Sequence, residues 1–206
     1  MKPALSLGEK ETQQHKRELR VAMRRTRRLM SRDHRREASS RACAHVLSLP
    51  EMATARVVAG YIAVRGEADP AEVLAQVRAR GGTVAYPRVV ADQRQLWFHA
   101  AEPEQLTPGP FGIAAPSERH PRLPLAAIDI VLVPGLAFDR RGSRLGWGQG
   151  HYDATLADCP GLRVGFGFHA QKIEHIPTSE HDVPLDLVIT EAGIERFGAR
   201  SLTGAP

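Results

Sequence analysis

The sequence has no run of apolar residues that could cross a membrane, and it has few cysteines. A membrane-spanning helix needs about 20 mostly apolar residues, whereas the longest apolar stretches, such as residues 130–133, have the length of a strand. The N-terminus has no apolar core of a secretory signal. Cys43 and Cys159 are too few and too far apart for a disulfide framework or a metal knuckle. We therefore expect a cytoplasmic protein with buried, reduced thiols and no membrane partner.

Basic residues are concentrated at one end of the chain. Residues 1–41 carry 13 Lys and Arg against 5 Asp and Glu, whereas the other 165 residues carry 15 against 18. Such a segment can bind nucleic acid, a membrane surface or a phosphorylated small molecule, or it can be a solvated helix. Lys16 and Arg20 are four residues apart and therefore share one helix face. No aromatic RNA-binding motif accompanies the charges, so we expect no nucleic-acid partner and keep that function as an alternative.

Predicted helices and strands alternate along most of the chain. Apolar residues recur at helical spacing over 13–30, and Ser31 is suited to cap a second helix that stops at Pro50. A third helix is expected after Asp69 as its N-cap, and a short one over 151–158. Apolar segments predict strands over 56–64, 83–87, 96–100, 128–134, 163–168 and 185–190.

This alternation predicts a single α/β domain with a mostly parallel sheet, flanked by helices on both faces in Rossmann-like layers. The β-α-β unit over 56–87 should cross over with a right hand to a parallel strand. We expect the domain to span residues 13–195, with 13–49 as its basic helical part. Residues 1–12 are expected to be a disordered leader, and residues 196–206 a flexible tail.

One segment, residues 130–153, carries the strongest chemical signal. It reads IVLVPGLAFDRRGSRLGWGQGHYD, with Arg144 among the glycines and with Asp139 and Asp153 beside them. Glycines permit positive φ and leave backbone N–H groups free to converge on an anion, and loops between a strand and a helix hold phosphates in α/β proteins. The segment is neither G-x-G-x-x-G nor a P-loop. We predict an anion-binding loop, with a flexible hairpin as the alternative, and we expect Asp139 to form a turn with Gly142.

This glycine-rich segment resembles the signature of the 5-formyltetrahydrofolate cyclo-ligase family, whose members are also called methenyltetrahydrofolate synthetases. Other segments resemble the family in the same order along the chain: KRELR at 16–20, GEADP at 66–70, YPRV at 86–89, FGI at 111–113 and SEHDVPLDLVITE at 179–191. The resemblance therefore covers residues 16–191, which is most of the chain.

The resemblance implies a reaction that uses ATP and Mg²⁺. Enzymes of this family close 5-formyltetrahydrofolate into 5,10-methenyltetrahydrofolate and release ADP and phosphate, with the formyl oxygen taking the γ-phosphoryl group first. Phosphoryl transfer needs positioning and charge stabilisation more than a protein nucleophile. The sequence, which offers no Ser-His-Asp or Cys-His arrangement, agrees with that requirement.

The resemblance also implies roles for individual residues. The implied ATP-binding residues are Lys16, Arg20, Arg144, Gly146, Trp147, Gly148, Gln149, Gly150, His151 and Tyr152. The implied catalytic residues are Arg144 and Tyr152, and the implied folate contacts are Ile62, Glu67, Phe111 and Trp147. The implied Mg²⁺ ligands are Asp153 and Asp182. Asp182 could instead cap a turn before Val183 and Pro184, and Lys16 and Arg20 could belong to a solvated face.

The sequence departs from the family pattern at two positions. His151 stands where the family usually has Tyr, and Ala115 stands where bacterial members have Glu. These departures leave open an ATP-binding paralogue of the same fold with a different acceptor or a regulatory role. The partner we expect is a folate, bound by a monomer.

Overall fold

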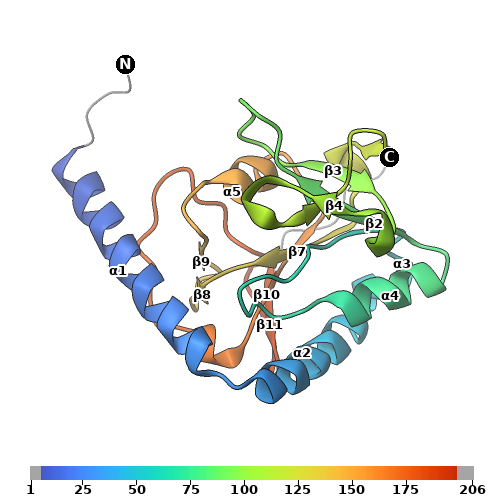
Figure 1. Ribbon diagram of the computed structural model, residues 1–206. Helices are drawn as coiled ribbons and strands as arrows, with labels where there is room; N and C mark the ends of the chain where they lie inside the picture. The colour runs from blue at the N-terminus through green and yellow to red at the C-terminus, as the bar shows by residue number, and fades with distance from the viewer. Residues whose placement is uncertain (1–5, 199–206) are drawn as a thin grey trace.

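An eight-stranded sheet forms the centre of the computed structural model, which describes residues 6–198 apart from the side chain of Phe111 (Figure 1). The strand order is β12-β11-β10-β7-β1-β2-β3-β6. The parallel strands are β11 (Leu187–Thr190), β10 (Leu162–Phe166), β7 (Ile130–Pro134), β1 (Val57–Ala59) and β2 (Thr83–Arg88). Antiparallel pairing adds β12 (Gly193–Arg196), β3 (Trp97–Ala100) and β6 (Arg122–Leu123).

Two small hairpins lie outside this sheet. They pair β4 (Thr107–Pro108) with β5 (Ala114–Ala115), and β8 (Ala137–Phe138) with β9 (Arg144–Leu145). The α-helices are α1 (Leu7–Leu29), α2 (Arg32–Leu47), α3 (Pro50–Thr54), α4 (Ala71–Ala79) and α5 (His151–Leu156). Short 3-10 helices span Pro103–Gln105, Pro110–Gly112, Leu125–Ala127 and His169–Gln171. Among residues 6–198, no helix is both long enough and apolar enough to span a membrane.

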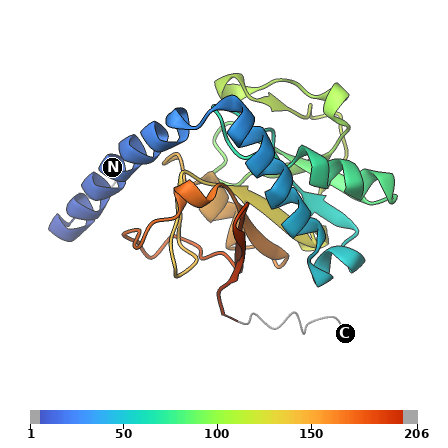
Figure 2. The ribbon, with the colours of Figure 1, turned by 90° about the horizontal axis from the view of Figure 1, so that it is seen from below.

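Helices cover both faces of the sheet (Figures 1 and 2). On one face, α2 and α4 bury apolar side chains such as Val46 and Val77 against Leu132 of β7. On the other face, α5 buries Leu156 near Val131. Each such side chain stabilises the fold by roughly 1.5–3 kcal/mol through its removal from water. The predicted fold class, a single α/β domain with a mostly parallel sheet and helices on both faces, is confirmed.

The sheet has a topological switch point between β1 and β7. The chain leaves β1 through α4 and returns in β2 on one side, whereas it leaves β7 through α5 and returns in β10 on the other side. Right-handed crossovers in opposite directions place α4 and α5 on opposite faces. The loops that follow β1 and β7 therefore diverge at the carboxyl ends of these strands, where α/β proteins bind their ligands.

Helix α1 is longer than the sequence predicted. It begins at Leu7 because Ser6 and Glu9 form a capping box, in which each side chain accepts a hydrogen bond from the backbone N–H of the other. The prediction of a disordered leader is therefore wrong for residues 7–12, while residues 1–5 lie outside the described residues. Met23 packs with the β8–β9 hairpin, and Figure 2 shows the first turns of α1 extending beyond the body of the protein.

Two other boundaries differ from the prediction. The strand expected over 56–64 ends at Ala59, and the following Gly60 lies so close to α4 that an added Cβ would come within 2.6 Å of the Leu74 side chain. The expectation of a flexible tail is wrong for residues 196 and 197, because Arg196 ends β12 and the backbone N–H of Phe197 donates to the Asp186 carbonyl. Residues 199–206 lie outside the described residues.

Candidate active site

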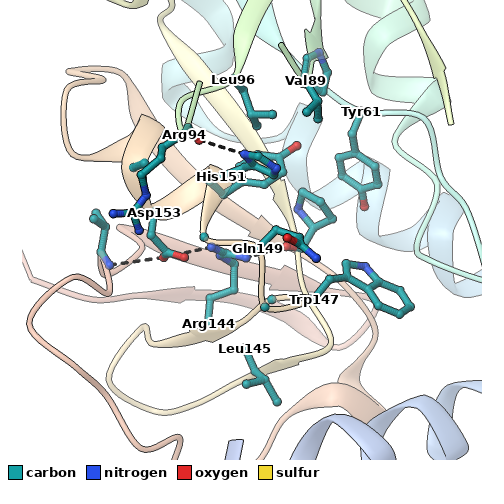
Figure 3. Close-up of a pocket in the computed structure, with 18 of the residues that line it drawn as sticks. Tyr61, Val89, Arg94, Leu96, Arg144, Leu145, Trp147, Gln149, His151 and Asp153 are labelled. Atoms are coloured by element: carbon teal, nitrogen blue, oxygen red, sulfur yellow. Dashed lines mark hydrogen bonds and ion pairs between the residues drawn. The ribbon is translucent and has the colours of Figure 1, made fainter. Parts of the chain in front are cut away.

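A cavity of about 730 Å³ opens at the carboxyl ends of β1 and β7. Pockets for small molecules have this size. In Figure 3, Arg94 and Asp153 lie on one side of the cavity, and Tyr61 and Trp147 lie on the other. The wall is built from α1, the loop after β1, the β4–β5 hairpin, the glycine-rich loop, the start of α5 and the loop over residues 179–183.

The first half of the glycine-rich segment is a structural hairpin. The buried carboxylate of Asp139 accepts hydrogen bonds from the backbone N–H groups of Arg141 (2.8 Å), Ser143 (2.9 Å) and Ile176 (3.0 Å). The N–H of Gly142 also donates to the Asp139 carbonyl, so the expected turn is confirmed. With its oxygens used in this way, Asp139 fixes the hairpin, and the loop over 146–150 faces the cavity.

Two glycines of that loop let arginine side chains approach the backbone closely. A Cβ on Gly146 would lie 2.6 Å from Nη1 of Arg144. Gly148 has φ 101°, and a Cβ there would lie 3.3 Å from the guanidinium carbon of Arg20. Arg20 also donates from Nε to the Gly146 carbonyl at 2.9 Å. The glycines therefore bring cations from α1 and β9 to one loop.

Two cation–carboxylate pairs lie on this side of the cavity. Lys16 Nζ is 2.5 Å from Asp182 Oδ2, and Arg144 Nη2 is 3.0 Å from Asp153 Oδ1. Burial raises the pKa of Asp182, but the hydrogen bonds from Lys16 and from the Ser179 backbone outweigh it, so the pKa lies below its ordinary value. Both carboxylates therefore face the cavity, each matched by a cation.

Tyr152 presents a buried hydroxyl that has no hydrogen-bond partner among the described residues. Its ring lies 5.5 Å from the guanidinium carbon of Arg144. Burial raises the pKa of Tyr152, so the hydroxyl stays neutral and can donate. The neighbouring Tyr61 differs because its hydroxyl already donates to the Ala68 carbonyl at 2.6 Å.

Glu67 and Trp147 meet on the other side of the cavity. Trp147 Nε1 donates to Glu67 Oε1 at 3.1 Å, and the Val64 N–H donates to Glu67 Oε2 at 3.2 Å. Burial raises the pKa of Glu67 above its ordinary value, and these hydrogen bonds and the charges of Arg27 and Arg65 oppose the shift without cancelling it. This side, the aromatic side of the cavity, therefore combines the Trp147 ring with a buried carboxyl group.

Nearly all the site residues implied by the family resemblance lie on this one cavity. Those that line it are Lys16, Arg20, Ile62, Glu67, Arg144, Gly146, Trp147, Gly148, Gln149, Gly150, His151, Tyr152, Asp153 and Asp182. Phe111 lies outside the residues whose side chains are described. Asp182 also makes the turn that the alternative interpretation expected, because it accepts from the Ser179 N–H at 2.7 Å. The solvated-face alternative is wrong for Lys16, which is 5% exposed.

Several residues at the site escaped the sequence analysis. Arg94 and Arg65 both line the cavity. The backbone carbonyl of Arg94 accepts a hydrogen bond from Nδ1 of His151 at 2.9 Å. Nothing in the sequence pattern distinguishes these two arginines from others. Arg27 is buried behind Glu67, and its position eleven residues after Lys16, three helical turns, was a usable signal.

Known proteins resemble this chain in both sequence and fold. The 5-formyltetrahydrofolate cyclo-ligase of Escherichia coli K12 is 28% identical over 178 residues, which cover 84% of this chain and 98% of the relative. The enzyme of the same name from Mycolicibacterium smegmatis is 32% identical over 144 residues, covering 66% and 73%. The NMR structure of Aquifex aeolicus 5,10-methenyltetrahydrofolate synthetase matches with a TM-score of 0.79 and 32% identity, covering 92% of this chain and 96% of that one.

The family itself is identified by its sequence model. The model of the 5-formyltetrahydrofolate cyclo-ligase family matches residues 12–191, which include most of α1, the glycine-rich loop and β11. The chain therefore belongs to the 5-formyltetrahydrofolate cyclo-ligase family.

Proposed function

We propose that the protein uses ATP and Mg²⁺ to close 5-formyltetrahydrofolate into 5,10-methenyltetrahydrofolate, with release of ADP and phosphate. The observation that carries the proposal is the division of one cavity into two parts. One part holds the cations Lys16, Arg20 and Arg144, and the other holds Glu67 and Trp147. A triphosphate suits the first part, and the flat, donor-rich pterin ring of a folate suits the second.

The cationic part fits the phosphates of ATP. Arg144 offers a planar fork of donors that matches phosphate oxygens, while Lys16 offers a point charge. Gly146 and Gly148 let the guanidinium groups of Arg144 and Arg20 lie against the loop, so an anion bound at this loop would meet both cations. Charge-assisted hydrogen bonds of this kind are stronger than hydrogen bonds between neutral groups.

The carboxylates of Asp153 and Asp182 fit Mg²⁺ that arrives with a nucleotide. Among the described residues, no group of three or more His, Cys, Asp or Glu side chains could hold a metal ion alone. Mg²⁺ is usually held by one or two carboxylates together with water and substrate phosphates. When bound, it would neutralise charge on the phosphate oxygens during transfer.

The proposed reaction has two steps. The formyl oxygen of the folate attacks the γ-phosphorus of ATP, so that an O–P bond forms as the bond to ADP breaks. N10 of the folate then attacks the activated formyl carbon, a C–N bond forms, the C–O bond to phosphate breaks and N10 gives up its proton. A formyl oxygen is a poor leaving group until it carries phosphate, which explains the need for ATP.

The side chains of the cavity suit these steps. Arg144 would stabilise the charge that spreads over the transferring phosphoryl group. The neutral Tyr152 hydroxyl, buried and unpaired within the described structure, would donate a hydrogen bond to the reacting oxygen. Glu67 would accept hydrogen bonds from the pterin ring, and Trp147 beside it offers an aromatic face.

Purified protein mixed with 5-formyltetrahydrofolate, Mg²⁺ and ATP tests the proposal. We expect the absorbance of the methenyl product to appear only when all three are present, together with stoichiometric ADP. Folded protein that turns over ATP without forming the methenyl product would favour a different acceptor. Folded protein that forms no product and hydrolyses no ATP would contradict the proposal.

Removing the charge of either proposed metal ligand should raise the Mg²⁺ requirement. Asp153→Asn and Asp182→Asn keep the shape of the side chain, and we expect each to raise the Mg²⁺ concentration for half-maximal activity by about tenfold or more, a loss of roughly 1.4 kcal/mol. The matched control is Asp158→Asn, because Asp158 is exposed and does not line the cavity. Unchanged Mg²⁺ titrations in both test variants would contradict the assignment.

A further inference from the structure

Arg27, in the last turn of α1, is a buried cation close to the site but not on the cavity wall. It is 2% exposed, and its Nη1 lies 3.8 Å from Glu67 Oε1. That distance is too long for a hydrogen bond, and Nη1 has no hydrogen-bond partner among the described residues. A buried guanidinium with an unmatched donor is costly for stability, so its position calls for a role.

Arg27 contacts both residues that form the aromatic side of the cavity. Besides facing Glu67, its guanidinium carbon lies 5.4 Å from the centre of the Trp147 ring. Trp147 in turn donates to Oε1 of Glu67, the same oxygen that Nη1 of Arg27 faces. Arg27 therefore joins α1 to the loop after β1 and to the glycine-rich loop, three segments far apart in the sequence.

Arg27 is the buried one of the two cations that face Glu67. The other, Arg65, is exposed, and water and salt screen its charge. The remaining titratable groups that face Glu67 are the hydroxyls of Tyr61 and Tyr152, which burial keeps neutral. The charge that opposes the effect of burial on the Glu67 carboxyl therefore comes mainly from Arg27.

We propose that Arg27 is a positioning residue, which acts through Glu67 and Trp147 and holds the Glu67 carboxylate ionised and aimed at the pterin ring. This inference rests on the proposed function for the identity of the ligand. A pterin ring presents N–H donors, which an ionised carboxylate accepts and a protonated carboxylic acid accepts poorly. Arg27 itself need not touch the folate.

A titration without any ligand tests the link between Arg27 and Glu67. Trp97 and Trp147 are the two tryptophans of the chain, so in a Trp97→Phe background the fluorescence of Trp147 reports on its hydrogen-bond partner Glu67. We expect a pH-dependent change that Glu67→Gln abolishes. In Arg27→Gln its midpoint should move up by about one pH unit, because loss of the cation raises the pKa of Glu67 further.

Matched variants keep this test decisive. Arg28→Gln removes an exposed arginine next to Arg27 and should leave the midpoint unchanged. Arg27→Lys keeps the charge without the planar guanidinium, so its midpoint should stay close to that of the parent protein. If Arg27→Gln fails to fold, Arg27→Lys is compared with Arg27→Met, which removes the charge. An equal rise of the midpoint in these two variants would contradict the role of the charge.

Kinetics then separate positioning from a merely structural role. For Arg27→Gln we expect the acid limb of kcat/KM for the folate to move up with the fluorescence midpoint, while KM for ATP stays within about twofold. A structural role would lower kcat/KM evenly at all pH values. Folded Arg27→Gln with an unchanged midpoint would overturn the inference, even if the protein proves to be a cyclo-ligase. A shifted midpoint in a protein without cyclo-ligase activity would instead support the Arg27–Glu67 link and contradict the proposed function.

Discussion

Replacing Arg144 with alanine is expected to lower kcat/KM for the proposed cyclisation about 10²- to 10³-fold, equivalent to about 2–4 kcal/mol. Arg144 lies in β9 at the start of the glycine loop, with its guanidinium 3.0 Å from Asp153 and beside the Tyr152 ring. A guanidinium that is already held in place stabilises the charge on a transferring phosphoryl group without reorganising. The rate of product formation at saturating and limiting ATP measures the effect.

The expected loss of activity has to be separated from a loss of folding, since the Arg144 side chain is only 4% exposed. Its removal leaves Asp153 without its cation, but that side chain is 20% exposed and water can hydrate it. We therefore expect thermal unfolding to move by much less than the rate does. Arg140→Ala, at an exposed neighbouring position, is the control. An Arg144→Ala protein that melts normally and keeps near-normal kcat/KM would show that Arg144 has no catalytic role.

The parts of the site that the sequence could predict are local. The glycines around Arg144 create the close approaches that the structure contains, because a missing Cβ is visible in the sequence itself. Asp139 and Gly142 form their turn within four residues, which is why that expectation is confirmed. Helix starts with a side-chain cap, such as the one at Ser31, are local in the same sense.

The parts that the sequence could not predict depend on distant contacts. Asp182 caps a local turn and also pairs with Lys16, which lies 166 residues away in the sequence, so the two interpretations of Asp182 were not exclusive. Gly60, just after the end of β1, passes close to Leu74 on α4, a contact that no local pattern reveals. Charge alone could not tell which arginines of α1 face the body of the protein, and Arg27 is the one that is buried among the described residues of that helix.

The burial of Arg27 decides which variants of the basic N-terminus are suitable controls. Because Arg27, Arg28 and Arg35 do not line the cavity, we expect substitution of any of them to change ATP affinity by less than about 0.5 kcal/mol. Arg27 is buried against Glu67, and Arg35 donates from Nη1 to the Met30 carbonyl at 2.7 Å, so substitution of either can also disturb folding. Arg28 is exposed and remains a suitable control.

Lys16→Ala and Arg20→Ala should each weaken ATP binding by roughly 10- to 150-fold, because one charge-assisted contact to phosphate contributes about 1.5–3 kcal/mol. Both residues lie on the face of α1 that lines the cavity, and Arg20 already contacts the glycine loop at Gly146. Calorimetric titration of ATP into each folded variant measures the change. Arg28→Ala and Arg32→Ala, at exposed positions, should bind ATP like the parent protein.

A nucleic-acid function for the same segment would give a different pattern. Many of the 11 Lys and Arg residues over 16–41 would then contribute comparably, and binding would weaken steeply with salt because each neutralised phosphate releases counterions. The structure favours the pattern expected for ATP binding, since Lys16 is buried against Asp182 and cannot lie on an exposed basic surface. Equal small losses of ATP affinity at Lys16, Arg20, Arg28 and Arg32, together with tight and salt-sensitive binding of RNA or DNA, would overturn the assignment of α1 to ATP.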